Sequence, residues 1–359
     1  PPAAPWQGVR SADRFSPICM QPGAYPDDAP AEPMSEDCLY LNVWAPADPH
    51  DGPLPVMFWI HGGGLLNGTA STPLYAGDML AQRGVIVVTA NYRLGGFGFL
   101  AHPDLSRESQ HHVSGNYGLL DQLAALGWVQ RNIAAFGGDP TNVTVFGQSS
   151  GSISISVLVS SPQARGLFQR AIGQSGGLFE PIEVGPEFTL TGAEQIGEAF
   201  AARLGAPSLQ ALRALPASKI VAQRFHPQPN IDGFLLHESP YEAHAHGRVN
   251  DVDILLGSNT EEGLYFVSGR SIGANNLRDV LEQDFPSFIV SLIGPKQPAD
   301  DLAARAAFVA FEADMRFGWD MWAWARLHVD MGKRNTFLYR FSHRSPGEQG
   351  ASHGAEMAY

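Results

Sequence analysis

The chain alternates short, almost wholly apolar runs with longer stretches in which apolar residues recur every third or fourth position. Residues 54–60 and 84–90 are runs of the first kind, typical of strands in a sheet that is covered on both faces. Residues 117–136 show the helical spacing, and Gly137 and Gly138 are placed to end that helix.

The same pattern continues along the rest of the chain. Strands alternating with helices predict an α/β fold with a mostly parallel central sheet and helices on both faces. We find no internal repeat, so residues 1–359 are expected to form a single domain. The further strands are expected at residues 37–44, 143–146, 170–173, 253–256 and 336–341, and the further helices at 299–309 and 322–329.

Composition narrows the class of protein. Hydrophobic residues make up 44% of the chain, and the mean hydropathy is −0.10, as in a soluble globular protein. The longest apolar runs are too short to cross a bilayer. The net charge of −13 argues against nucleic acid or an anionic membrane as a partner.

The predicted strand at residues 143–146 runs directly into Gly147-Gln148-Ser149-Ser150-Gly151. This is the glycine-x-serine-x-glycine pattern of a nucleophile elbow, a sharp turn from strand to helix that exposes the serine hydroxyl above a sheet. The flanking glycines are needed because a Cβ there would collide with neighbouring backbone. Ser149 is therefore the candidate nucleophile.

A second match to the pattern centres on Ser175, at residues 173–177. Pro181 and Pro186 follow it, and prolines suit the packed helix of an elbow poorly. We therefore prefer Ser149 to Ser175.

The segment after Ser149 carries a conflicting signal. Ile153, Ile155 and Val157 alternate with serines, which by period alone indicates a strand. We nevertheless predict a helix, because the small residues at 150–152 would let a helix pack close to the sheet.

A serine nucleophile also needs amides that stabilise the oxyanion of the tetrahedral intermediate. Gly62, Gly63 and Gly64 follow the buried strand at 54–60, and without side chains their amides can approach a substrate oxygen. The amide of Ser150 would complete the oxyanion hole.

An acid and a base must follow the serine in the chain. Glu261 and Glu262 come after the predicted strand at 253–256, where ligand sites lie in such sheets; the residues alone do not decide between them. For the base, His353 lies in a glycine-flanked loop beyond the last strand, and His343, which ends that strand, is its rival. The remaining candidates are expected to be exposed in polar loops: His111, His112, His244 and His246.

The chain has two cysteines, Cys19 and Cys38, which bracket a loop rich in Pro, Asp and Ala. A loop that cannot bury itself is a natural place for a disulfide, with two free thiols as the alternative. No third thiol or histidine stands nearby at metal-ligand spacing.

Taken together, these motifs resemble those of the type B carboxylesterases, the cholinesterase-like branch of the α/β-hydrolases. The resemblance covers nearly the whole chain, with the family extending further at both ends. The shared motifs are residues 35–42 (SEDCLYLN), 59–64 (WIHGGG), 91–94 (NYRL), 98–100 (GFL), 115–122 (GNYGLLDQ), 136–140 (FGGDP), 143–151 (VTVFGQSSG), 168–175 (FQRAIGQS), 257–263 (GSNTEEG) and 353–354 (HG).

The resemblance implies the α/β-hydrolase fold and a serine carboxylesterase that hydrolyses small-molecule esters through an acyl-enzyme intermediate, without metal or cofactor. It implies a triad of Ser149 as nucleophile, Glu262 as acid and His353 as base. Two alternatives remain open: a non-catalytic binding or adhesion protein, and a hydrolase of carbamate or amide bonds.

The resemblance also implies an oxyanion hole formed by the amides of Gly63, Gly64 and Ser150, and a buried serine, Ser175, near the triad. It further implies a disulfide between Cys19 and Cys38, and hence a secreted or periplasmic location.

The chain departs from the family at two positions next to the nucleophile. Gln148 stands where many members have Glu, and Ser150 where most have Ala. The loop between the cysteines also contains no Trp, which counts against a cationic choline ester as substrate.

Overall fold

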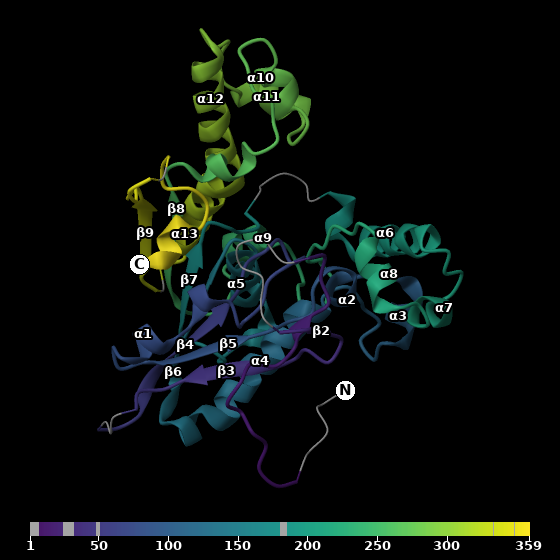
Figure 1. Cartoon of the computed structure of the whole chain (residues 1–359), viewed down its shortest axis with the longest axis vertical. Coiled ribbons are helices and arrows are strands. Elements are labelled where there is room, and N and C mark those ends of the chain that lie inside the picture. The colour runs from purple at the N-terminus through teal and green to yellow at the C-terminus, as the bar shows by residue number, and fades with distance from the viewer. Residues whose placement is uncertain (1–6, 24–31, 48–50, 180–184, 333, 348) are drawn as a thin grey trace.

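A computed structural model describes residues 7–23, 32–47, 51–179, 185–332, 334–347 and 349–359 (Figure 1). Its centre is a seven-stranded sheet in the order β3-β5-β4-β6-β7-β8-β9, beside a two-stranded sheet of β1 and β2. The strands are β1 Ile18–Cys19, β2 Met34–Ser35, β3 Leu41–Trp44, β4 Leu54–Ile60, β5 Ile86–Ala90, β6 Gly138–Gln148, β7 Arg170–Gln174, β8 Asp253–Asn259 and β9 Thr336–Phe341.

The prediction of a mostly parallel sheet is confirmed, since only β3 runs antiparallel to its neighbour, β5. The first predicted strand is shorter than expected. Residues 37–40 precede the ladder because the Tyr40 amide donates to the Cys38 carbonyl within a turn (2.9 Å), and pairing begins at Leu41.

Helices pack against the sheet, with α5 beside β6 and β7 and α13 beside β8 and β9. The predicted helix at 117–136 is confirmed as α4 plus a 3₁₀ turn, and it ends at Gly137 with φ 83°. The α-helices are α1 Asp78–Ala81, α2 Gly95–Phe99, α3 Pro103–Glu108, α4 Tyr117–Asn132, α5 Ser150–Ser160, α6 Leu190–Arg203, α7 Leu209–Arg213, α8 Ala217–Ala222, α9 Pro240–Ala245, α10 Leu277–Leu281, α11 Ser287–Ile293, α12 Asp301–Ala313 and α13 Trp319–Asp330.

Shorter turns complete the element list. The π-turn η6 joins α12 to α13 without a break in the helical path. The 3₁₀ turns are η1 Pro73–Tyr75, η2 Ile133–Phe136, η3 Pro162–Ala164, η4 Pro186–Phe188, η5 Glu262–Phe266 and η7 Ala355–Ala358, and the π-turn η6 is Asp314–Gly318.

Residues 150–160 form the helix α5, as expected from their small residues and against their alternation. Nearly every side chain of α5 is buried, so no polar face was available to set a helical period. Gly151 permits the contact with β4, because a Cβ there would lie 2.1 Å from the Ile60 carbonyl oxygen.

The described residues contain two hydrophobic clusters. The larger one surrounds the sheet. The smaller one joins η5 to α10, α11 and α12, which project from the sheet at the top of Figure 1. Phe308 and Leu281 are its most deeply buried large side chains.

One expectation about the histidines is wrong. His111, His112 and His246 are exposed as predicted, but His244 is only 1% exposed. It lies on α9 against α13, where its Nδ1–H donates to the Pro240 carbonyl (2.8 Å) and its Nε2 accepts from the Trp324 indole (3.0 Å). The short polar-looking segment forms a packed helix that the pattern did not reveal.

The predicted disulfide between Cys19 and Cys38 is confirmed. Both cysteines are buried, and β1 pairs with β2 beside the bridge. Part of the proline-rich loop between them, residues 24–31, lies outside the described residues, as does Pro181. Closing a loop of this length stabilises a fold by about 3 kcal/mol in the chain-entropy model.

Among the residues described, no helix combines the length and apolar character needed to cross a membrane.

Acid should destabilise the protein through His244. Burial lowers its pKa from 6.5 to about 3, so between these values the unfolded chain binds a proton that the folded chain does not. The free energy of unfolding should therefore fall as pH drops from 6.5 towards 3, by about 1.4 kcal/mol per pH unit for this group. Urea unfolding at several pH values measures the slope.

The variant His244→Gln keeps an acceptor for the Trp324 indole and does not titrate, so its pH slope should be shallower. His112→Asn, at an exposed position, is the matched control and should keep the wild-type slope. Equal slopes in wild type and His244→Gln would contradict the assignment.

Candidate active site

Ser149 occupies a strained turn between β6 and α5. Its φ of 58° and ψ of −125° are unfavourable for any residue with a Cβ. The turn is so tight that a Cβ at Gly147 would lie 2.6 Å from the Ile60 carbonyl oxygen. The glycines that the elbow pattern requires are thus present for the expected reason.

Neighbouring strands hold the Ser149 backbone in this conformation. Its amide donates to the carbonyl of Gln174 at the end of β7 (2.8 Å). A Cβ at Gly176 would lie 2.4 Å from the Ser149 carbonyl oxygen. The half-buried Ser149 lines a cavity of about 690 Å³.

Glu262 begins η5, just after β8, and its side chain is fully buried. Its Oε1 accepts from the Ser175 hydroxyl (2.5 Å) and from the Asn259 amide (2.7 Å), and its Oε2 faces His353. Glu261 points elsewhere, since its carboxylate accepts from the Ala351 amide (2.9 Å). The geometry separates two glutamates between which the residues alone did not decide, although the resemblance implied Glu262.

The His353 imidazole is oriented on several sides. Its Nδ1–H donates to Glu262 Oε2 at 2.6 Å. The Phe317 ring stacks on it with centroids 4.4 Å apart, and the Tyr265 ring meets it edge-on at 5.5 Å. The rival, His343, is exposed and contacts Phe341 and Tyr359 in place of the cavity.

The other imidazole nitrogen of His353 is occupied by Gln148. The Gln148 side-chain amide donates to His353 Nε2 at 3.0 Å. No hydrogen bond joins the Ser149 hydroxyl to His353 within the described ranges, although both line the same cavity. Such contacts are often long before substrate binds.

The predicted oxyanion amides lie at the same cavity. Gly63 and Gly64, which line it, have φ of 104° and 63°, and Ser150 begins α5. Among the residues described, no chain group accepts from these three amides. A free amide at a helix N-terminus favours a negative charge nearby.

Ser175 directly follows β7 and has an elbow-like φ of 53°. It is 0% exposed, and its hydroxyl donates to Glu262. It is therefore a buried partner of the acid, and its motif does not present it to the cavity.

The sequence reasoning missed three residues at the site. Phe317 and Tyr265 contact His353 from η6 and η5, and no motif marks them. Glu356 is buried beside Glu262, accepts from the Asn259 side chain and has its pKa raised by burial. Its only sequence signal is its place three residues after His353.

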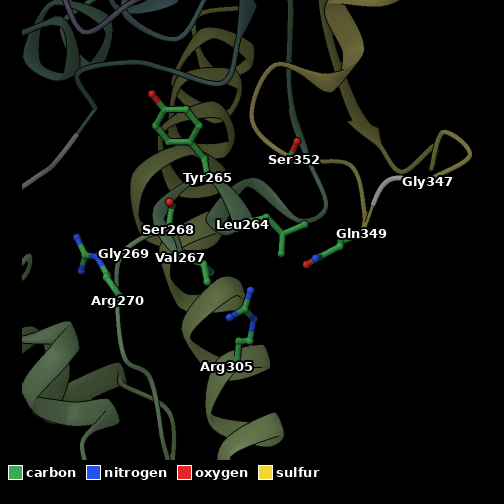
Figure 2. Close-up of a pocket in the computed structure, with 10 residues that line it drawn as sticks. All are labelled: Leu264, Tyr265, Val267, Ser268, Gly269, Arg270, Arg305, Gly347, Gln349 and Ser352. Carbon is green, nitrogen blue, oxygen red and sulfur yellow. The ribbon is translucent and has the colours of Figure 1, made fainter. Parts of the chain in front are cut away.

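Tyr265 lines both the cavity that Ser149 lines and a second hollow of about 610 Å³. Figure 2 shows the Arg305 side chain of α12 and the Gln349 side chain reaching towards it beside Leu264. Within the part of the chain that the structure describes, no group of His, Cys, Asp and Glu gathers as a metal site requires.

Comparison with known proteins agrees with this geometry. The model of the carboxylesterase family matches residues 1–359. Over the whole chain the sequence is 37% identical to a fumonisin B1 esterase of Sphingopyxis macrogoltabida, of which it spans 68%. Over 74% of the chain it is 42% identical to a para-nitrobenzyl esterase of Bacillus subtilis, of which it spans 55%. The chain therefore belongs to the carboxylesterase family and has its α/β-hydrolase fold.

Proposed function

We propose that this protein hydrolyses carboxylic esters with a triad of Ser149, Glu262 and His353. The observation that carries the proposal is the 2.6 Å contact between His353 and Glu262 at the cavity that the elbow serine lines. Serine is a weak nucleophile until a base takes its proton, and the base needs an acid to orient it.

The first half of the reaction forms an acyl-enzyme. His353 Nε2 exchanges the Gln148 amide for the Ser149 hydroxyl and takes its proton as the oxygen attacks the ester carbonyl. The carbonyl oxygen becomes negative and accepts from the amides of Gly63, Gly64 and Ser150. His353 then returns the proton to the departing alcohol.

The second half releases the acid. Water enters, His353 takes one of its protons, and the resulting oxygen attacks the acyl carbon. The second tetrahedral intermediate collapses when Ser149 leaves and regains its proton from His353. Throughout, Glu262 stabilises the imidazolium and holds Nδ1–H as its donor; the bonds from Ser175 and the Asn259 amide fix the carboxylate.

The substrates we propose are small-molecule esters that fit a cavity of about 690 Å³. The names of the two relatives, esterases of fumonisin B1 and of para-nitrobenzyl esters, support this class. The cavity wall is mixed: Leu74 and Phe266 are apolar, whereas Asn67, Thr69 and Gln228 are polar.

Labelling of the nucleophile should separate the two elbow-like serines. Ser149→Ala should abolish labelling by a fluorophosphonate, because the label forms a bond to the activated hydroxyl. Ser175→Ala, which removes a buried partner of Glu262, should remain labelled. Gel fluorescence and peptide mapping measure the result, and an adduct on Ser175 would overturn the assignment.

The next prediction separates the two glutamates. Glu262→Gln should lower kcat by about 10⁴-fold, the loss seen when a triad carboxylate becomes an amide. Glu261→Gln should cost far less, because its carboxylate contacts the Ala351 amide and not the imidazole. Steady-state kinetics decide, and equal losses would leave the choice of Glu262 unsupported.

We also propose a secreted or periplasmic location, on the ground that disulfides persist in oxidising compartments. Protein purified from its native host, unfolded without reductant, should show no reactive thiol because Cys19 and Cys38 are bridged. Two titratable thiols in that protein would refute the proposed compartment.

A further inference from the structure

The segment 62–68, here called the glycine loop, carries two of the proposed oxyanion amides. Its backbone takes positive φ at several positions, 104° at Gly63, 57° at Leu65 and 120° at Gly68, and of these three Leu65 alone has a Cβ that makes this conformation unfavourable. A non-glycine residue with positive φ persists only where the surroundings impose it. The shape of the glycine loop therefore has to come from contacts outside it.

Bonds within the glycine loop are few. The amides of Leu66 and Asn67 both donate to the Gly63 carbonyl, at 3.1 and 3.0 Å, and form one turn. The amides of Leu65, inside that turn, and of Gly68, just after it, donate instead to side chains from distant parts of the chain.

Ser150 contacts the turn itself. Its hydroxyl accepts from the Leu65 amide at 3.1 Å, and the residue is 1% exposed. The Tyr92 phenol donates to the carbonyl of His61, the residue that precedes the glycine loop (2.8 Å).

Gln21 contacts the residue that follows the turn, Gly68. Its Oε1 accepts from the Gly68 amide (2.9 Å), and its Nε2 donates to the Gly68 carbonyl (3.0 Å) and to the Cys19 carbonyl (3.1 Å). The side chain binds both backbone groups of one residue, Gly68, through its acceptor and its donor, and Gln21 is 4% exposed. Its contact with Cys19 ties the glycine loop to the disulfide.

We propose that Gln21 and the Ser150 hydroxyl are positioning residues that fix the oxyanion amides of the glycine loop, Ser150 through the turn itself and Gln21 through the residue that follows it. This inference rests on the proposed function, because the catalytic role of those amides belongs to that proposal. It gives Ser150 two tasks: its amide faces the substrate oxygen, while its hydroxyl holds the loop that supplies the other donors.

Loss of either contact should act on the transition state, in which the oxyanion is fully formed. Gln21→Met and Ser150→Ala should each lower kcat about tenfold, the equivalent of about one hydrogen bond. KM should change by less than about twofold, because ground-state binding is retained. The affinity for a trifluoromethyl ketone, which forms an oxyanion on the nucleophile, should fall by the same factor as kcat.

Two matched controls remove similar contacts elsewhere. Gln130→Met deletes a glutamine amide that bridges the Pro140 and Leu167 carbonyls. Ser156→Ala deletes a buried hydroxyl on α5 that bonds only the Ile153 carbonyl. Both should keep wild-type kcat and ketone affinity.

Hydrogen–deuterium exchange of the full chain gives a readout that is independent of activity. Peptides covering the glycine loop should exchange faster in Gln21→Met and Ser150→Ala than in the two controls. Unchanged exchange in both variants would overturn the inference, as would a KM effect without loss of ketone affinity. Wild-type protein that hydrolyses no ester would refute the proposed function instead, while exchange would still test the hold on the loop.

Discussion

The close approach of α5 to the sheet is the constraint on which the site depends. At Gly151 the helix lies so near the Ile60 carbonyl that no Cβ fits. At Gly147, β6 likewise lies too close to that carbonyl for a Cβ. This approach forces the strained backbone of Ser149 and lifts its side chain into the cavity. The cost is offset by the buried helix and by the sheet that surrounds it.

Sheet topology then brings the remaining groups together. The glycine loop follows β4, Ser149 follows β6, Ser175 follows β7 and Glu262 follows β8, and these four strands are parallel neighbours. Carboxyl ends of parallel strands share one edge of a sheet, which is where ligands bind in such folds. The order of the strands in the sheet is therefore enough to bring these residues, which lie far apart in the chain, to one edge.

Beneath the cavity lies a buried polar network. Glu262 is held by Ser175, Asn259 and His353, and Glu356 bonds the Asn259 side chain and Gln174. Burial raises the pKa of Glu356, and the nearby Glu262 adds to that rise. Two carboxyl groups this deep persist because their oxygens have partners.

The sequence by itself determined the class of fold and indicated most of the candidate site residues, since long apolar strands, glycine patterns and motif order are local properties. Without the resemblance, the residues did not separate Glu261 from Glu262, because adjacent side chains differ only in the direction that the η5 turn gives them. The sequence misjudged His244, whose burial depends on the packing of α9 against α13. Phe317 contacts His353, while Gln21 and the Ser150 hydroxyl contact the glycine loop. Each of these contacts joins two segments that lie far apart in the sequence. Such contacts arise from how distant segments meet, so only the tertiary structure decided them.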